Sequence, residues 1–281
     1  MHKSILITGC SSGIGLDAAT VLRSRGYDIV ATARRPEDVS RLKSLGIKAL
    51  TLDTANSESI DVALKQLFEM THGRLGGLFN NAGFAIPGAV EDLSRNALQS
   101  QFETNVFGPF EIIHKIMPVM RKQGYGRIIQ NSSVLGLVTL PFRGAYCASK
   151  FAMEALSDTL RLELTGTNIH ISLIEPGPIL SQFRQNSYKA FQAHIDTERS
   201  AFTDRYKNMV SRLTREGPVA PFTLPASAVV DKLIHALESP RPKARYHVTL
   251  PTYIFAYLKR FLPTNALDRI LLKVSKKELS N

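Results

Sequence analysis

Cysteine is scarce in this chain of 281 residues, which contains only Cys10 and Cys147. Two cysteines do not make a disulfide framework, so a reducing cytoplasm is the expected compartment. Cys147 follows a tyrosine, and a redox switch is one interpretation of that neighbour. We favour a small residue packed in a helix, because no charge pattern nearby would activate the thiol.

Long apolar runs are missing as well. The longest one near the C-terminus covers residues 253–258, which is far too short to span a bilayer as a helix. The first three residues lead directly into an apolar stretch at residues 5–7, so no secretory signal is expected. The seven histidines lack the spacing of zinc ligands, and we predict no metal site.

Acidic residues are outnumbered, because 24 Asp and Glu oppose 35 Lys and Arg and leave a formal net charge of +11. Residues 239–281 hold nine basic and two acidic residues, so this segment alone carries a net +7. Such an end can contact nucleic acid, anionic lipid or no partner at all. No nucleic-acid-binding motif accompanies the charge, so nucleic acid is not an expected partner.

What the chain does have is a hydrophobic content of 44%, which is typical of a globular protein, and a length that suits one large α/β domain. A short buried strand is expected at residues 3–8 and an apolar-periodic helix at residues 16–25. Between them lies a glycine-rich turn, where the backbone can approach a phosphate and a helix N-terminus can bind it. In this turn we expect cofactor contacts from Gly9, Ser11, Ser12, Gly13, Ile14 and Gly15.

The end of the second expected strand, at residues 28–33, is where a dinucleotide fold selects its cofactor. An acidic residue here would suit the ribose of NAD, but this chain has Arg34 and Arg35. Arginine suits the 2′-phosphate of NADP, and Ser11 and Ser12 can donate to the same group. The alternative is a solvated start to the next helix; we favour NADP(H) as cofactor.

Strands expected at residues 47–52 and 75–79 are each followed by polar residues. In open α/β sheets, ligands bind beyond the carboxyl ends of the strands. Asp53 either meets the adenine there or only caps the helix that starts near Ser57. The segment after the strand at 75–79 either forms an ordinary turn or lines the cofactor with its backbone. This segment contains Asn81, Ala82 and Gly83.

Helical patterns follow at residues 94–108 and 109–121, with Asn105 inside them as a local hydrogen-bonding residue. A strand at residues 127–131 then delivers Ser132 and Ser133. The loop at residues 134–143 is unusually apolar and includes Leu140 and Phe142. It predicts either the wall of a substrate pocket or ordinary packing under the sheet.

Tyr146 and Lys150 lie four positions apart at the start of a helix expected at residues 145–165, so they share one face. A lysine cation close by favours the phenolate and lowers the tyrosine pKa, which makes the pair a candidate proton-transfer device. Ser133 can hold a substrate oxygen beside them. Taken alone, such a pair is in most proteins only two surface residues on a helix, so the rest of the chain must decide.

The βα alternation breaks after the sixth expected strand, at residues 168–174. Residues 179–224 form an insertion that mixes aromatic and charged residues, as lids and binding loops do. A helix at 226–237 and a strand at 246–250 then complete a domain over residues 1–250. Residues 251–281 predict a basic amphipathic extension that either lies on an anionic membrane, at its inner face, or packs over the substrate cleft or a neighbouring subunit.

The complete set of motifs is far more specific than its parts, and it resembles the short-chain dehydrogenase/reductase family over residues 3–250. The resemblance implies a single Rossmann-type, doubly wound α/β domain whose seven-stranded parallel sheet is flanked by helices, here with a C-terminal amphipathic helical extension. The matching residues, in chain order, are Thr8, Gly9, Gly13, Gly15, Asp53, Asn80–Gly83, Asn105, Ser133, Tyr146, Lys150, Pro176 and Gly177.

The resemblance also implies roles for these residues. Tyr146 is the general acid/base, and Lys150 binds the nicotinamide ribose and lowers the tyrosine pKa. Ser133 orients the carbonyl or alcohol, while Asn105 supports a proton relay through water to Lys150. Pro176 and Gly177 belong to the cofactor site, and Ser181 stands where the family often has a threonine that contacts the nicotinamide amide.

The glycine-rich loop and the arginines after the second strand look most like the retinol and 17β-hydroxysteroid dehydrogenase branch, and bacterial aldehyde reductases are similar too. The expected function is NADP(H)-dependent hydride transfer to or from a hydrophobic aldehyde, retinoid or steroid-like ketone. A homodimer or homotetramer is expected. The alternative is a non-catalytic NADP-binding sensor or partner-binding module. We expect substrate contacts from Ser133, Leu140, Phe142, Tyr146 and Phe183.

Overall fold

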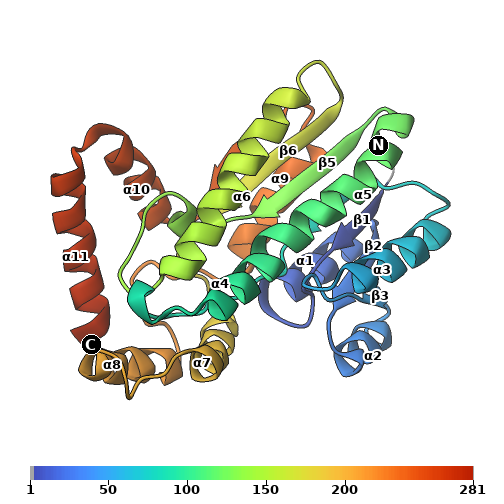
Figure 1. Cartoon of the computed structure of the whole chain (residues 1–281). Helices are drawn as coiled ribbons and strands as arrows, with labels where there is room; N and C mark the ends of the chain where they lie inside the picture. The colour runs from blue at the N-terminus through green and yellow to red at the C-terminus, as the bar shows by residue number, and fades with distance from the viewer. Residues whose placement is uncertain (1–2, 281) are drawn as a thin grey trace.

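Seven parallel strands form the centre of the protein, in the order β3-β2-β1-β4-β5-β6-β7. In the computed structural model (Figure 1), residues 3–280 are described, apart from the side chains of residues 277–280. The strand order reverses between β1 and β4, and such a switch point opens the crevice in which doubly wound sheets bind nucleotides. The strands are β1 (Ser4–Ile7), β2 (Asp28–Ala33), β3 (Lys48–Thr51), β4 (Gly77–Asn80), β5 (Gly126–Asn131), β6 (Ile169–Glu175) and β7 (Arg245–His247).

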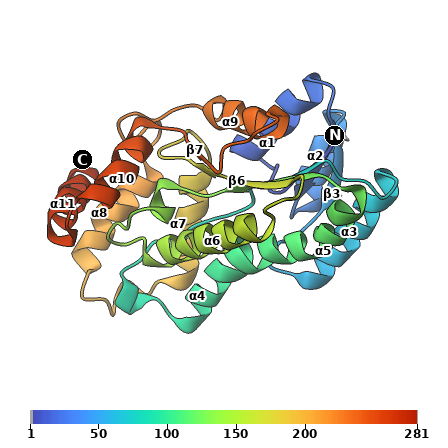
Figure 2. The same ribbon diagram turned by 90° about the horizontal axis from the view of Figure 1, so that it is seen from above.

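Helices cover both faces of this sheet (Figure 2). On one face, α1, α2 and α9 bury an apolar cluster that includes Leu22 and Leu233. On the other face, α3 and α5 bury a second cluster that includes Leu67 and Ile112. The sheet helices are α1 (Gly13–Ser24), α2 (Pro36–Ser44), α3 (Ser57–Met70), α4 (Arg95–Phe102), α5 (Gly108–Gln123), α6 (Gly144–Glu163) and α9 (Ser227–Glu238).

The expected single Rossmann-type sheet is confirmed, and the differences from the sequence predictions lie at element ends. Helix α1 starts at Gly13, three residues earlier than expected, because the last glycines of the turn already form its first turn. The strand expected at 246–250 ends at His247, because Thr249 is already the N-cap of the next helix, which begins at Leu250 with Pro251 in its first turn. A π-helical turn, η2 (Glu103–Phe107), joins α4 directly to α5.

The insertion at residues 179–224 folds into α7 (Phe183–His194) and α8 (Thr203–Thr214). A parallel bridge between Ile179 and Leu224 closes its base, with Leu180 N–H donating to the Leu224 carbonyl at 2.9 Å. Its helices bury a third apolar cluster, which includes Phe191 and Tyr206. The insertion is therefore a packed lobe attached to the sheet by a narrow base.

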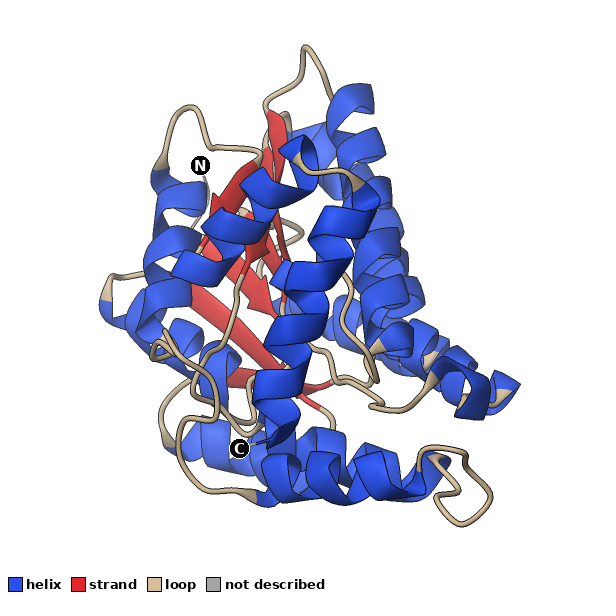
Figure 3. Ribbon diagram, turned by 90° about the vertical axis from the view of Figure 1, so that its left-hand side faces the viewer, coloured by secondary structure: helices blue, strands red, loops and turns tan. Residues whose placement is uncertain are grey.

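The C-terminal extension consists of α10 (Leu250–Phe261) and α11 (Thr264–Ser280), separated at Pro263. Helix α10 lies against the short helix η3 (Val134–Gly136) and α11 lies against α8 of the insertion. Figure 1 shows both helices at the end of the molecule away from β3, and Figure 3 views the molecule from that end. Among the described residues, the longest apolar helical segment is still too short or too charged to cross a membrane.

Candidate active site

Three of the predicted catalytic side chains meet at the carboxyl end of β5. Ser133 begins η3, where its Oγ accepts a hydrogen bond from the Leu135 N–H at 3.1 Å. Tyr146 lies in the first turn of α6, and its hydroxyl is hydrogen bonded to that of Ser133. Lys150 follows one turn later with its Nζ 5.7 Å from the centre of the Tyr146 ring. All three are buried, so their charges and hydroxyls are shielded from bulk water.

Burial dominates the electrostatics of this group. It raises the pKa of Tyr146, and the hydrogen bond with Ser133 opposes the rise only partly. Burial also lowers the pKa of Lys150 to about 8, although the Glu154 carboxylate favours the cation. The pKa of Tyr146 is therefore raised in this structure and not lowered as expected. Desolvation is the larger effect, and the ammonium is directed to the Asn131 carbonyl, to which it donates at 2.7 Å.

Asn105 lies in the π-helical turn η2, where its side chain fixes the backbone that follows Gly83. Its Oδ1 accepts from the Phe84 N–H at 3.2 Å, and its Nδ2 donates to the Phe84 carbonyl at 3.0 Å. The same Nδ2 lies 3.0 Å from Ser149 Oγ on α6. The side chain thus connects the β4 loop to the catalytic helix. A proton relay through water stays a prediction.

The glycine-rich turn forms a tight cradle at the start of α1. Gly9 has a φ of +71°, and a methyl group on it would lie 2.7 Å from Cα of Ala82. At Gly15, a methyl group would lie 2.2 Å from the Gly9 carbonyl oxygen. No side chain caps α1 at Ser12, so its first N–H groups are available to a phosphate. The residues present therefore fit a bound dinucleotide.

A set of hydrogen-bonded polar side chains, here called the lock, holds this cradle in place. Its hydrogen bonds were not predicted from the sequence. The Thr8 hydroxyl accepts from the N–H groups of Asn81 and Ala82 at 2.9 and 3.0 Å. Asn81 Nδ2 donates to the carbonyls of Thr8 and Gly9, both at 3.0 Å. Asn131 completes it by donating to Asn81 Oδ1 at 2.9 Å. The signal was present in the sequence, because each of these residues ends or follows a strand.

The two predicted NADP-selecting arginines start α2, beside the glycine-rich turn. Arg35 is exposed and pairs with Asp38 at 2.9 Å. Arg41, which was not predicted, also pairs with Asp38 at 2.9 Å and donates to the Ser11 carbonyl. The buried Asp38 therefore holds two cations near the loop. Asp38 is three residues from each arginine, and this helical spacing was the sequence signal for the two ion pairs.

Asp53 does not cap α3, because Asn56 takes that position and accepts from the Ser59 N–H at 2.8 Å. Asp53 Oδ1 instead accepts from the Ala55 N–H at 3.0 Å and stabilises the turn before the helix. Asparagine and aspartate are equally good N-caps, so the sequence did not distinguish these two positions. Its contact with adenine stays a prediction.

The loop after β6 closes over the cradle from the other side. The Pro176 carbonyl accepts from the Val134 N–H at 2.8 Å. Gly177 leaves no room for a side chain, since a methyl group there would lie 2.0 Å from Thr249 Oγ1. Ser181 lies over the turn, with its Cβ 3.1 Å from the position of a methyl group on Gly13. Of the predicted cofactor residues of this loop, Ser181 lies at the glycine-rich turn, while Pro176 and Gly177 contact Val134 and Thr249.

The predicted substrate residues separate into two groups. Phe183, the first residue of α7, packs its ring against Tyr146 with centroids 5.5 Å apart. Leu140 packs in the small apolar cluster that contains Tyr146. Phe142 lies in the cluster of the insertion instead, where its ring meets those of Phe202 and Tyr206 at 5.5 and 5.8 Å. We therefore assign Phe142 to the packing of the lobe.

A buried charge cluster, also missed, lies beneath the catalytic residues. Glu154 follows Lys150 by one turn of α6, accepts from Ser132 Oγ and pairs with Arg245 of β7. Burial raises the pKa of Glu154 to about 7, and the nearby Glu175 adds to the rise. Arg245 also pairs with Glu175 and Asp158. The spacing of Glu154 from Lys150 was visible in the sequence, but its burial was not.

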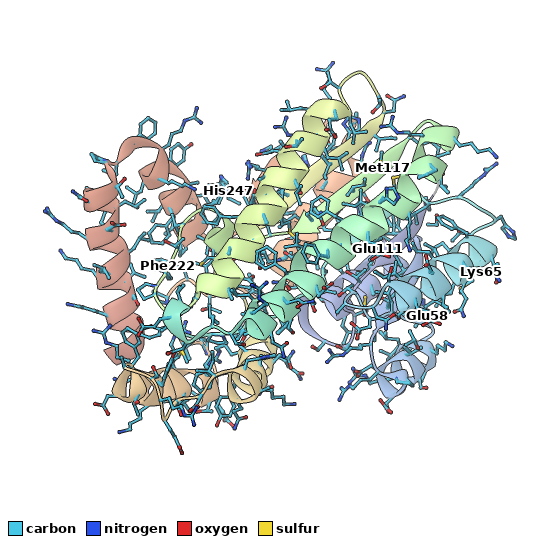
Figure 4. All side chains as sticks on the ribbon, in the orientation of Figure 1. Glu58, Lys65, Glu111, Met117, Phe222 and His247 are labelled. Atoms are coloured by element: carbon cyan, nitrogen blue, oxygen red, sulfur yellow. The ribbon has the colours of Figure 1, made fainter. Side chains whose placement is uncertain are left out.

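The cluster reaches the C-terminal extension through His247, which is labelled in Figure 4. The His247 ring contacts Glu175 and meets the Tyr253 ring of α10 edge to face, with centroids 5.2 Å apart. Glu175 directly precedes Pro176 of the cofactor loop. The charge cluster thus joins the catalytic helix, the cofactor loop and α10.

Fold and site together define a Rossmann-type oxidoreductase that binds a nicotinamide dinucleotide. The chain belongs to the short-chain dehydrogenase family, whose family model matches residues 3–191. It is 44% identical over 273 residues to the uncharacterised oxidoreductase YbbO of Escherichia coli, covering 96% of this chain and 94% of that protein. It is 33% identical over 274 residues to human 17-beta-hydroxysteroid dehydrogenase type 1, covering 92% of this chain and 78% of that protein.

Human retinol dehydrogenase 8 is 38% identical over 187 residues, which cover 64% of this chain and 60% of that protein. Solved structures share the fold. A short-chain dehydrogenase from Burkholderia phymatum in complex with NAD is 24% identical with a TM-score of 0.75, covering 91% of each chain. One from Burkholderia cenocepacia in complex with NADP is 22% identical with a TM-score of 0.74, covering 97% of this chain and 99% of that one. One of these two neighbours thus holds NAD and the other NADP.

Proposed function

We propose that this protein is an NADP(H)-dependent oxidoreductase that transfers hydride between the nicotinamide and a hydrophobic carbonyl compound or alcohol. The observation that carries the proposal is the hydrogen-bonded pair of Tyr146 and Ser133 hydroxyls, buried beside the Lys150 ammonium. A buried acid of this kind suits proton transfer to a substrate oxygen. The intact trio argues against a non-catalytic sensor, which has no need of it.

The proton chemistry falls to the protein. A bound nicotinamide supplies or accepts the hydride. Tyr146 donates its proton to the carbonyl oxygen during reduction and takes one from the alcohol during oxidation, while the Ser133 hydroxyl orients that oxygen. The phenolate left after reduction is costly in a buried site, and the Lys150 cation offsets part of that cost.

The test of this mechanism is Tyr146→Phe, which removes the proton and keeps the ring. We expect turnover to fall roughly 10²–10⁴-fold, as is typical for the loss of a general acid or base. NADPH binding, measured by fluorescence titration, should change little. Near-normal turnover with cofactor binding intact would sink the mechanism, and tight NADPH binding by a wild-type protein without any activity would favour a sensor instead.

The preference for NADP(H) rests on the cations at the start of α2. Arg34 and Arg35 are exposed there, and Arg41 is held against the Ser11 carbonyl by Asp38. Arginine is suited to phosphate because its guanidinium donates bidentate hydrogen bonds. Replacing Arg34 and Arg35 together by alanine should weaken NADPH much more than NADH, and Arg199→Ala serves as a control. Equal weakening of both cofactors would contradict the 2′-phosphate site.

A hydrophobic substrate is supported by the apolar side chains that meet Tyr146. Phe183 and Leu140 pack on that side of the site, and the curated relatives include proteins named for retinol and 17-beta-hydroxysteroid substrates. Profiling with NADPH over aliphatic aldehydes, retinal and ketosteroids tests the class, with small polar sugars as the comparison. Activity on the sugars alone would overturn the apolar pocket.

The proposal includes an assembly of two or four copies. Exposed apolar side chains at Phe107, Leu156 and Leu162, on and next to helices α5 and α6, support it. Light scattering on the purified full chain measures the assembly directly. A monomer at micromolar concentration would contradict this part of the proposal.

A further inference from the structure

Helix α10 exposes a continuous apolar face at the end of the molecule opposite β3. At 3.6 residues per turn, its large apolar residues at spacings of three, four and seven fall on one side. Their exposed fractions, between 42% and 74%, are high for residues of this size. We define the α10 stripe as Leu250, Tyr253, Ile254, Tyr257 and Phe261.

The opposite side of α10 is attached to the body of the protein. Thr252 is fully buried against Thr249 and the cofactor loop. The Lys259 ammonium lies 4.4 Å from the centre of the Phe151 ring of α6. Thr252 and Lys259 lie near one another on the helix circumference, about half a turn from the stripe. Apart from Tyr253, whose ring also meets His247, the α10 stripe therefore points away from the body.

Exposed cations lie on α10 beside the stripe and on the next helix, α11. Arg260 is exposed on α10, and Arg269, Lys273 and Lys276 are exposed on α11. Leu271 of α11 is buried, and that helix packs on α8, so its basic side faces outward. Asp268 is the one acidic residue between residues 250 and 276. An apolar strip bordered by positive charge is the pattern of a helix that lies in a lipid interface.

We propose that the α10 stripe and the basic side of α11 dock the protein on an anionic lipid bilayer. In this arrangement α10 lies in the plane of the membrane, with its stripe at the boundary of head groups and acyl chains. The arginine and lysine side chains contact lipid phosphates. A second copy of this chain is a poorer occupant, because both surfaces would carry the same positive charge.

Co-sedimentation of the full chain with vesicles tests this surface, using phosphatidylcholine with and without phosphatidylglycerol. We expect binding to the anionic vesicles that weakens with salt, and little binding to phosphatidylcholine alone. The combined change Tyr257→Ser and Phe261→Ser should lower partitioning at least about tenfold. Removing three cations, Arg269→Ala with Lys273→Ala and Lys276→Ala, should lower it roughly 100-fold on anionic vesicles, at about 1 kcal/mol for each cation.

A matched control uses two exposed apolar residues from the other end of the molecule. Leu45 and Val62 are each 51% exposed on or next to α2 and α3, and Leu45→Ser with Val62→Ser should leave vesicle binding unchanged. Circular dichroism and light scattering on every variant verify folding and mass. The proposed docking site is wrong if the wild type does not bind anionic vesicles. It is also wrong if the variant with serine at positions 257 and 261 binds them as tightly as the wild type. A fall in assembly mass in that variant, without vesicle binding by the wild type, would assign the stripe to a second copy.

Discussion

The proposed cofactor side and the proposed substrate side of this site are built by different means. On the cofactor side, backbone lies against backbone: Gly9 approaches Ala82, and the Thr8–Asn81–Asn131 lock holds the strand ends together. On the substrate side, rings lie against rings, as Phe183 does on Tyr146 and Phe142 on Phe202. The first arrangement depends on the absence of a side chain at the glycines, and the second depends on the size of the rings.

This difference explains why the two sides differ in how much change they tolerate. A backbone contact closer than 3 Å leaves no room for an added methyl group, so the residue type is fixed by geometry. A ring packed beside a lobe can be exchanged for another apolar side chain at modest cost. Substrate preference can therefore change within this fold while the cofactor cradle stays constant.

Gly15→Ala gives the largest effect expected on the cofactor side. The added methyl group would lie 2.2 Å from the Gly9 oxygen and 2.6 Å from Asn81 Nδ2, so the turn must shift. A displacement of this size can cost about 100-fold in function, and we expect NADPH affinity to fall by that order. Isothermal titration measures the fall. Gly124→Ala, where nothing lies near the added methyl group, is the control; equal losses in both variants would show that the tight cradle is not the cause.

Phe183→Ala gives a smaller effect, confined to the substrate side. Losing the ring on Tyr146 should raise the KM for bulky apolar substrates roughly 10–100-fold, as for other truncations in an apolar pocket. Affinity for NADPH should stay within about twofold. Phe222, labelled in Figure 4, is a matched control from the same insertion because it is 57% exposed. If Phe183→Ala weakened NADPH as much as Gly15→Ala, the separation of the two sides would fail.

The sequence predicted the cofactor side better than the substrate side, and for the same physical reason. Residues fixed by close backbone contact form short local motifs, so Gly9 and Gly15 could be found by spacing. The Tyr146–Lys150 pair became specific only together with the other motifs. Contacts between distant elements have no such pattern. The role of Phe142 depends on how the insertion folds back, and that of Arg245 on which strand pairs with β6.

The direction of the Tyr146 pKa shift was predicted wrongly for a related reason. Spacing shows which charge is near a group, but not how far the group is removed from water. Here burial raises the pKa of the phenol, although a lysine lies one turn away. Desolvation can only be judged once the packing of η3 and α7 around the ring is known.

A substitution in the buried charge cluster is expected to have the smallest effect on activity, and it distinguishes the role of Glu154 from that of Arg245. Glu154 favours the cation of Lys150, whose pKa is about 8 and therefore below the raised pKa of Tyr146. As the pH rises, enzyme activity should therefore fall first because Lys150 loses its proton.

Glu154→Gln removes the carboxylate charge, so the pKa of Lys150 should fall further and the alkaline limb of kcat/KM should move to lower pH. We expect a shift of less than one pH unit, which is a few-fold loss of activity near pH 8.5. Asp158→Asn is the control, because Asp158 also pairs with Arg245 while Lys150 responds to Glu154. An equal shift in both variants would assign the effect to Arg245, and an unmoved limb in Glu154→Gln would remove Glu154 from the electrostatics of the site.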